Sequence, residues 1–390
     1  MQRPVAASIV VETAPLVLDI GIVLLIAATL GYIARRFGLP AIVGYLFAGL
    51  MVSQFTPGYT AGSDEISLLA DIGVVLLLFE VGIEINLSKL RRRQKALLWG
   101  SPLQISIGML IGTPVFLLLG LSTLAALLLS LSVAMSSSVV IVNITKSRSR
   151  TTDRATEEAL LAWSVLQDIV GVAIASFILV LYGNDDRTLL QAAGGLVGFG
   201  ITAFVSARLL PTLLRKVRTS PDLFLIYSVS IGLVLAALGA TIFGIPMALA
   251  AFVAGLAIRN GEDTDEVRRV LLPFRDLFAV LFFVLIGSLI QPSLINEALP
   301  FALLLLGLML LIKTIPTYLI VKFTDINSRP KQHAVGLSQL GEFSFVLGSA
   351  ALTAGAISSD QFNGVLIAVV ISIIGSSIIV KLAGRPRARN

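Results

Sequence analysis

The sequence contains no cysteine and only one histidine, His333, among its 390 residues. The absence of cysteine excludes disulfides, thiol nucleophiles and cysteine-based metal sites. We expect His333 to lie in a basic loop, because it follows a stretch rich in lysine and arginine. A single histidine without other ligands does not predict a metal site, and the chain has no phosphate-cradling glycine loop. Nothing here predicts an enzyme or a bound cofactor.

Charged residues are also scarce. They make up 13% of the chain, 56% of the residues are hydrophobic, and the mean hydropathy is +0.95. An ordinary soluble domain carries about 25% charged residues. This composition predicts a membrane protein whose surroundings are a lipid bilayer, and it excludes a nucleic-acid partner as the reason for the net charge of +6.

About thirteen apolar windows are long enough to be membrane helices. They cover residues 14–34, 38–53, 65–86, 97–120, 123–144, 156–182, 190–214, 222–240, 245–259, 274–291, 299–322, 332–354 and 361–382. We therefore expect an all-α membrane protein with a single transmembrane domain, residues 1–390. Because the chain ends at Asn390, shortly after the last window, we expect no soluble regulatory domain.

Lysine and arginine alternate along the chain with the apolar windows. Of the 29 such residues, all but Arg3, Arg187, Arg208 and Lys313 lie in seven short stretches, at the end of every second window. Short cytoplasmic loops accumulate positive charge. This pattern predicts an N-terminus outside and a C-terminus in the cytoplasm.

The second and ninth windows resemble each other. Residues 39–52 read LPAIVGYLFAGLMV, and residues 245–258 read IPMALAAFVAGLAI. Because they are seven positions apart in the order of windows, an odd number, they cross the membrane in opposite directions, which is typical of an inverted-topology repeat. We expect two repeats of six helices, joined by a linker helix at about 190–214.

Small residues and polar residues occur in different parts of each repeat. Small residues suited to tight helix packing in lipid occur in helices at about 14–86 and 222–291. Polar patches occur at about 97–182 and 299–382. We expect the first group to form a scaffold and homodimer interface, and the second to form a moving core.

Asp168 is the main candidate for ion binding, with Gln167 beside it. Asp168 lies about halfway along its apolar window, where an ionisable residue normally faces a pathway or a partner. Burial disfavours the charged form of a carboxylate, so such a group can hold either a proton or a cation near neutral pH. The structural alternative is a hydrogen bond between helices.

Two further polar patches interrupt apolar windows at matching positions of the two repeats. One contains Ser136, Ser137 and Ser138, and the other contains Gln339 and Glu342. Interrupted helices at corresponding places mark a transporter's binding site, although serines in a membrane helix can also serve only close packing.

Two charged residues need separate explanations. Lys313 lies deep in an apolar window, so it must be paired or neutral; Asp168 and Glu342 are its candidate partners. Glu80 lies toward the inner end of its window and could belong to a cytoplasmic funnel.

At this point the sequence resembles a known family, the monovalent cation:proton antiporters of the second type, and within it the Kef-type potassium/proton branch. The matching strings run in order along nearly the whole chain: VGYLFAGL (43–50), IGVVLLLFEVGIEI (72–85), AMSSSVVIV (134–142), VLQDIVGV (165–172), MALAAFVAGL (247–256), LFFVLIG (281–287), LLIKTIPTYLI (310–320) and SQLGEFSFV (338–346).

The resemblance implies a sodium/proton-antiporter-like fold with thirteen helices, two of them discontinuous and crossed, and a homodimer in a bacterial or archaeal inner membrane. It implies ion binding at Gln167 and Asp168 with Ser137 and Ser138 nearby, and a structural or charge-balancing role for Lys313. A neutral residue at position 167 is typical of electroneutral exchange of K⁺ for H⁺. The sequence departs from the family at Leu340 and Glu80, and a separately encoded soluble regulatory subunit remains an option.

Other functions stay open. The transported cation could be Na⁺ instead of K⁺. A different class of function would be a gated cation channel or a membrane sensor on the same scaffold. No filter-like glycine-rich loop lies between short helices, which favours the antiporter.

Overall fold

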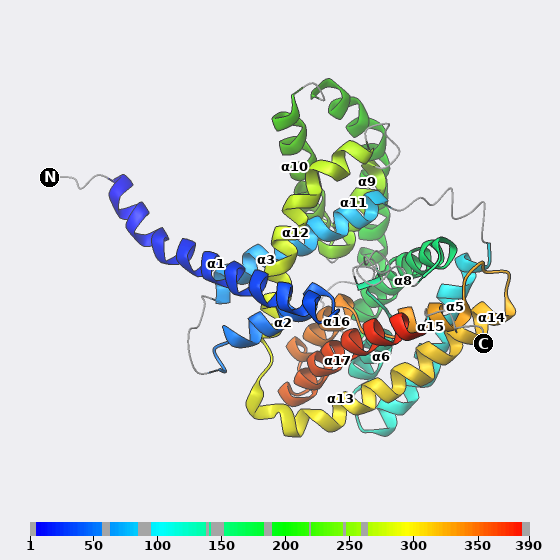
Figure 1. Ribbon diagram of the computed structural model, residues 1–390. Coiled ribbons are helices and arrows are strands. Elements are labelled where there is room, and N and C mark those ends of the chain that lie inside the picture. The colour runs from blue at the N-terminus through cyan, green and yellow to red at the C-terminus, as the bar shows by residue number, and fades with distance from the viewer. Residues whose placement is uncertain are drawn as a thin grey trace, which may run out of the picture. The chain divides into compact units, whose positions relative to one another are not determined.

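The structure, a computed structural model, describes residues 5–56, 63–84, 95–137, 140–141, 152–182, 189–217, 220–244, 247–258 and 264–383. Within these ranges every regular element is a helix, as expected from the sequence (Figure 1). The chain divides into two compact units, and each unit is built from two separate stretches. Met1–Glu84 and Gly195–Pro292 form the first unit, and Ile85–Gly194 and Ser293–Asn390 form the second.

The first unit contains the helices with the small-residue segments, α2 (Ala41–Met51) and α11 (Met247–Ile258). Its other elements are α1 (Val5–Arg36), α3 (Ser63–Glu84), α10 (Pro221–Thr241) and α12 (Thr264–Ser288), and α9 (Leu189–Val217) continues into it from the second unit. Helix α3 packs against α11 and α12, and α2 packs against α1 and α12.

Close helix contact in this unit depends on glycine. A Cβ added at Gly49 of α2 would collide with the carbonyl oxygen of Val284 in α12, and one at Gly255 of α11 would collide with that of Phe79 in α3. The small-residue faces therefore pack against other helices of the same unit, where backbone meets backbone without a side chain between them.

The second unit contains the polar patches. Its elements are α5 (Lys95–Leu118), α6 (Thr123–Ala134), α8 (Arg154–Tyr182), a 3₁₀ turn reaching Leu294, α13 (Ile295–Met309), a π-helical turn (Leu310–Thr314), α14 (Ile315–Phe323), α15 (Pro330–Leu337), α16 (Glu342–Thr353) and α17 (Ser359–Ala383). Helix α5 packs against α6 and α8, and α13 lies along α17 (Figure 1).

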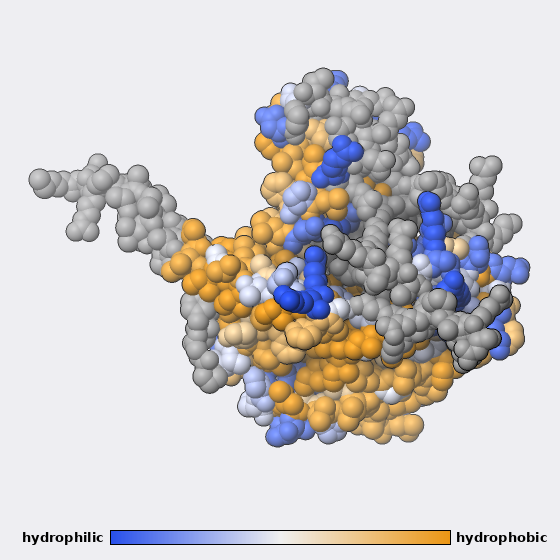
Figure 2. All heavy atoms as spheres, viewed as in Figure 1, coloured by the Kyte–Doolittle hydropathy of each residue, from blue (hydrophilic) through white to orange (hydrophobic). Residues whose placement is uncertain are grey.

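Seven helical segments of the described chain are long and apolar enough to cross a membrane. They are Val17–Arg36, Ala96–Leu118, Arg154–Leu179, Asp222–Thr241, Arg269–Ser288, Pro292–Phe323 and Ser359–Val380. Large apolar side chains on α13, such as Leu303, are exposed, and Figure 2 shows apolar residues in orange over the surface around this helix. Such a surface suits a lipid environment rather than water.

The predicted windows differ from the helices at several ends. Helix α1 starts at Val5 and α12 starts at Thr264, both earlier than their windows. The window at 123–144 contains α6, which ends at Ala134. The window at 332–354 contains two helices, α15 and α16, separated by four residues that are not helical.

Candidate ion-binding site

Two helices of the second unit are interrupted. Helix α6 ends at Ala134, and Met135 continues in an extended conformation (φ −86°, ψ 152°). Helix α15 ends at Leu337, and Gly341 is again extended (φ −109°, ψ −170°) before α16 begins at Glu342. Each interruption frees main-chain N–H and C=O groups, which in lipid need partners from the protein.

The two interruptions lie against each other. A Cβ added at Gly341 would lie 2.8 Å from both the nitrogen and the Cβ of Ser137, so this close approach requires glycine. Ser136 Oγ donates to the carbonyl of Leu337 over 2.7 Å. Gln339 Oε1 accepts from the Ser137 N–H (3.1 Å), and Gln339 Nε2 donates to the Ser137 carbonyl (3.0 Å). Side chains from each patch therefore form hydrogen bonds with main-chain groups of the other patch.

Lys313 binds both interruptions at once. It is fully buried, and its Nζ donates over 2.7 Å to the carbonyls of Met135 and of Gln339. The sequence suggested carboxylate partners, Asp168 or Glu342, but these two bonds go to backbone oxygens. A carbonyl at a helix break carries a partial negative charge, which explains how it can hold an ammonium group.

Lys313 lies in an unusual piece of helix. Leu310–Thr314 forms a π-helical turn between α13 and α14. Single π turns frequently occur at functional sites, because the extra residue displaces a side chain and loosens the hydrogen-bond ladder. Here the carbonyl of Ile312 accepts a hydrogen bond from the side chain of Gln104 (3.4 Å), and Thr314 Oγ1 lies 2.7 Å from Ser338 Oγ.

A pair of buried glutamines satisfies the last carbonyl of α6. The Ala134 carbonyl accepts from Gln104 Nε2 (3.3 Å) and from Gln167 Nε2 (3.1 Å). Gln167 Nε2 also donates to Gln104 Oε1. Both side chains are fully buried. Gln167, predicted as an ion-binding residue, thus lies at the break in α6.

Asp168 follows Gln167 on α8 and is only 3% exposed. Gly171, three residues further along, is in contact with the side chain of Met135 at the α6 break. Residues three apart share a face of a helix. Asp168 therefore lies on the α8 face that is turned toward the interrupted segment of α6.

Three predicted site residues are only partly described or lie elsewhere. Ser138 lies outside the described residues, as does the side chain of Glu342. Glu80 lies in the first unit, where it is buried and forms an ion pair of 2.8 Å with Arg275 of α12. The sequence did not identify this partner, because Arg275 is 195 positions away and belongs to one of the seven basic stretches that the charge pattern places on the cytoplasmic side.

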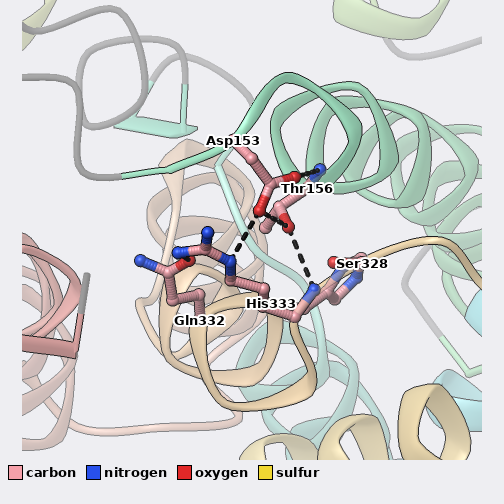
Figure 3. A network of polar contacts seen from close by, with 6 residues as sticks. Asp153, Thr156, Ser328, Gln332 and His333 are labelled. Carbon is pink, nitrogen blue, oxygen red and sulfur yellow. Dashed lines mark hydrogen bonds and ion pairs between the residues drawn. The ribbon is translucent and has the colours of Figure 1, made fainter. Parts of the chain in front are cut away.

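A second polar network joins the start of α8 to the loop before α15 (Figure 3). Asp153 accepts from the N–H of Thr156 (2.8 Å) and pairs with Arg329 (2.8 Å), and the Arg329 N–H donates to Thr156 Oγ1 (3.0 Å). The loop position expected for His333 is wrong. It lies in α15, fully buried, with its Nδ1 2.9 Å from Ser328 Oγ.

His333 is buried because its ring packs edge-on against Trp163 of α8, with centroids 5.2 Å apart. Trp163 belongs to a buried apolar cluster that includes Leu160 and Leu337. The aromatic contact and the Ser328 bond together give the imidazole a structural role at the junction of α8 and α15.

Gln104 is the site residue that the sequence analysis missed. It is the only glutamine or asparagine between Ala96 and Leu118, an apolar span. The same criterion that singled out Lys313, a polar side chain deep in an apolar helix, could have found it.

Comparison with known proteins decides the family. A model of the transmembrane sodium/hydrogen exchanger family matches residues 22–383. The chain belongs to the sodium/hydrogen exchanger family. The proteins that this family member resembles are transporters, which confirms the expectation that it is not an enzyme.

Two similar proteins cover nearly all of this exchanger-family chain. YbaL of Escherichia coli (strain K12), named as a candidate cation/proton antiporter, is 28% identical over 382 residues, which are 94% of this chain and 68% of YbaL. The sodium proton antiporter MjNhaP1 from Methanocaldococcus jannaschii, solved at pH 8, has a TM-score of 0.71 at 20% identity and covers 95% of this chain and 98% of its own. At that identity the second match shows the fold alone.

Proposed function

We propose that this protein is an electroneutral antiporter of the Kef type, which exchanges one K⁺ for one H⁺ across the membrane. The observation that carries the proposal is the buried carboxylate of Asp168 next to the neutral amide of Gln167, which binds the last carbonyl of the interrupted helix α6. Membership of the exchanger family and the named roles of YbaL and MjNhaP1 support cation/proton antiport.

In this proposal Asp168 binds either a proton or a cation, and never both. Burial makes the charged form of a carboxylate costly, so a cation that takes the place of the released proton offsets this cost. Because Gln167 cannot titrate, one positive charge enters for each one that leaves, and the cycle moves no net charge.

The two units provide a basis for alternating access. We assign the first unit, with its glycine-mediated helix contacts, to the scaffold and homodimer interface, and the second unit, with both interruptions, to the moving core. Helix α9 would be the linker of an inverted repeat of six and six helices, thirteen in all. The distribution of lysine and arginine supports an outer N-terminus and a cytoplasmic C-terminus in a bacterial or archaeal inner membrane. A soluble regulatory subunit would act from the cytoplasmic side.

The test is transport by the purified protein in liposomes. A pH-sensitive dye inside the vesicles should report proton movement when K⁺ is added outside, with the same rate at zero and at imposed membrane potential. Proton movement whose reversal point follows the membrane potential would contradict one-for-one exchange.

Na⁺ is the alternative cation. The family description and the name of MjNhaP1 both specify sodium. Adding Na⁺, Li⁺ or Rb⁺ in the same assay ranks the cations directly. A channel or a sensor would instead give, respectively, potential-driven flux without proton coupling, or no flux at all.

A further inference from the structure

The orientation of the Gln104 amide is fixed by the main chain. Its Nε2 lies 3.3 Å from the Ala134 carbonyl and 3.4 Å from the Ile312 carbonyl. A carbonyl oxygen can only accept a hydrogen bond, so the nitrogen of the amide must face both of them. The oxygen of Gln104 is consequently turned to the other side, where it meets Gln167.

Gln104 in turn fixes the amide of Gln167. Gln167 Nε2 has two N–H groups; one donates to Gln104 Oε1 and the other to the Ala134 carbonyl. Both donors are therefore occupied by the protein. Gln167 Oε1 is buried and has no hydrogen-bond partner among the described residues.

An acceptor left over in this way is unusual. Most buried polar side-chain atoms have a partner, and an exception calls for an explanation. An oxygen that carries no hydrogen is a ligand for a monovalent cation, as carbonyl oxygens are in potassium-selective filters. Gln167 is also the immediate neighbour of Asp168.

We propose that Gln104 is a positioning residue for the cation site, which holds the Gln167 amide so that its oxygen, and not its NH₂ group, is presented to the cation. This inference rests on the proposed binding of a cation at Gln167 and Asp168. Without Gln104, one N–H of Gln167 loses its acceptor, and the amide can rotate to present a donor, which repels a cation.

The experiment compares three variants in liposomes and in detergent. Gln104→Met removes the acceptor and the donors together. Gln104→Glu, when protonated, restores an oxygen that accepts from Gln167 and a hydroxyl that donates to the Ala134 carbonyl. Ser101→Ala is the matched control. Ser101 lies one turn before Gln104 on α5 and is fully buried. Like Gln104 it contacts α8, where its hydroxyl donates to the Trp163 carbonyl over 3.2 Å.

We expect Gln104→Met to raise the KM for the transported cation by about tenfold or more, the range found when a residue that orients a metal ligand is removed. The maximal rate should fall less, and the preference among K⁺, Na⁺ and Li⁺ should change. Gln104→Glu should recover much of the affinity, increasingly toward lower pH. Ser101→Ala should lower the unfolding temperature and leave KM and cation preference as in the wild type.

A second measurement reads binding without transport. The cation raises the unfolding temperature of a protein that binds it, relative to choline at equal ionic strength. The midpoint is the cation concentration that gives half of this rise in unfolding temperature. In Gln104→Met the midpoint should increase by the same factor as the KM. Unchanged KM, midpoint and cation preference in both Gln104 variants would overturn the positioning role, even if the wild type transports. A wild type that neither transports nor is stabilised by any of these cations would overturn the proposed function first, and this inference with it.

Discussion

Gln339 and Ser137 exchange two hydrogen bonds, the Ser137 N–H donating to Gln339 Oε1 and Gln339 Nε2 donating to the Ser137 carbonyl. The side-chain amide of Gln339 thus binds both the N–H and the carbonyl of Ser137, as a neighbouring main chain would in regular secondary structure. The two residues are 202 positions apart in the chain, so this pair fastens one interrupted helix to the other.

Gln339→Leu should destabilise the protein clearly. It removes the acceptor of the Ser137 N–H, and a buried donor without a partner costs about 1–3 kcal/mol. The Ser137 carbonyl loses one donor and keeps the N–H of Ile141. Thermal unfolding in detergent measures the loss. The control is Gln361→Leu, which loses only a hydrogen bond at the exposed start of α17. Equal unfolding temperatures for the two variants would contradict this account of the crossing.

Asp168→Asn should abolish exchange while the protein remains folded. Asparagine has nearly the same shape but cannot bind and release a proton. The measurement is K⁺- or Na⁺-driven proton movement in liposomes, with the unfolding temperature as the check on folding. Sustained cation-dependent proton movement by this variant would show that Asp168 is not the shared site.

Gln167→Asp should make exchange depend on voltage. A second carboxylate beside Asp168 allows a second proton to be carried per cycle, so that exchange moves net charge. Transport assays at several imposed potentials test this, with the wild type as the reference. A variant that transports at a rate independent of potential would argue against the role given to Gln167.

Lys313→Met should lower the unfolding temperature as well as the activity. The carbonyls of Met135 and Gln339 would both lose a charged donor, and a hydrogen bond to a charged group contributes about 1.5–3 kcal/mol. Lys322→Met is the matched control, because Lys322 is an exposed lysine on the adjoining α14. Equally small losses of unfolding temperature in the two variants would contradict the proposal that Lys313 connects the two interruptions.

Asp153→Asn should have a small effect that depends on pH. Burial raises the pKa of Asp153, but the hydrogen bonds from Thr156 and the positive charge of Arg329 outweigh it, so the pKa lies below its usual value. A carboxyl with a lowered pKa stabilises the fold above its ordinary pKa, and this contribution is lost as the pH falls through the lowered value. Asparagine keeps the Oδ1 that accepts from the Thr156 N–H at the start of the helix, and it replaces the Oδ2 that pairs with Arg329 and accepts from the Thr156 hydroxyl.

The expected loss for Asp153→Asn at neutral pH is below about 1 kcal/mol, because both side chains of the pair are more than a third exposed. Unfolding temperatures measured from neutral to acidic pH should converge for wild type and variant. A difference that persisted unchanged into acid would mean that the charge of Asp153 does not contribute.

The sequence predicted those features of the fold that depend on local composition. Apolar windows located the helices, and the unusual polarity of Ser136–Ser137 and of Gln339 located both interruptions. The start of α12 at Thr264 was missed because a polar turn can continue an apolar helix beyond its window.

The partners in the site were harder to predict, for a physical reason. Lys313 binds main-chain carbonyl oxygens. Every residue has such an oxygen, so the sequence does not indicate which residues are the partners. The Gln104–Gln167 contact joins helices 63 positions apart, and either glutamine alone looks like a residue that merely packs. His333 was misplaced because its burial depends on Trp163, which the sequence does not connect to it.

Every hydrogen bond described around Gln104, Gln167, Lys313 and Gln339 joins residues of the second unit. A displacement of that unit as a rigid body would break none of them. The energetic barrier to the proposed transport cycle would then include dehydration of the cation, and it would not include rebuilding of these hydrogen bonds. Substitutions at the Gln104 and Gln167 amides could therefore change the choice of cation without changing the movement of the unit.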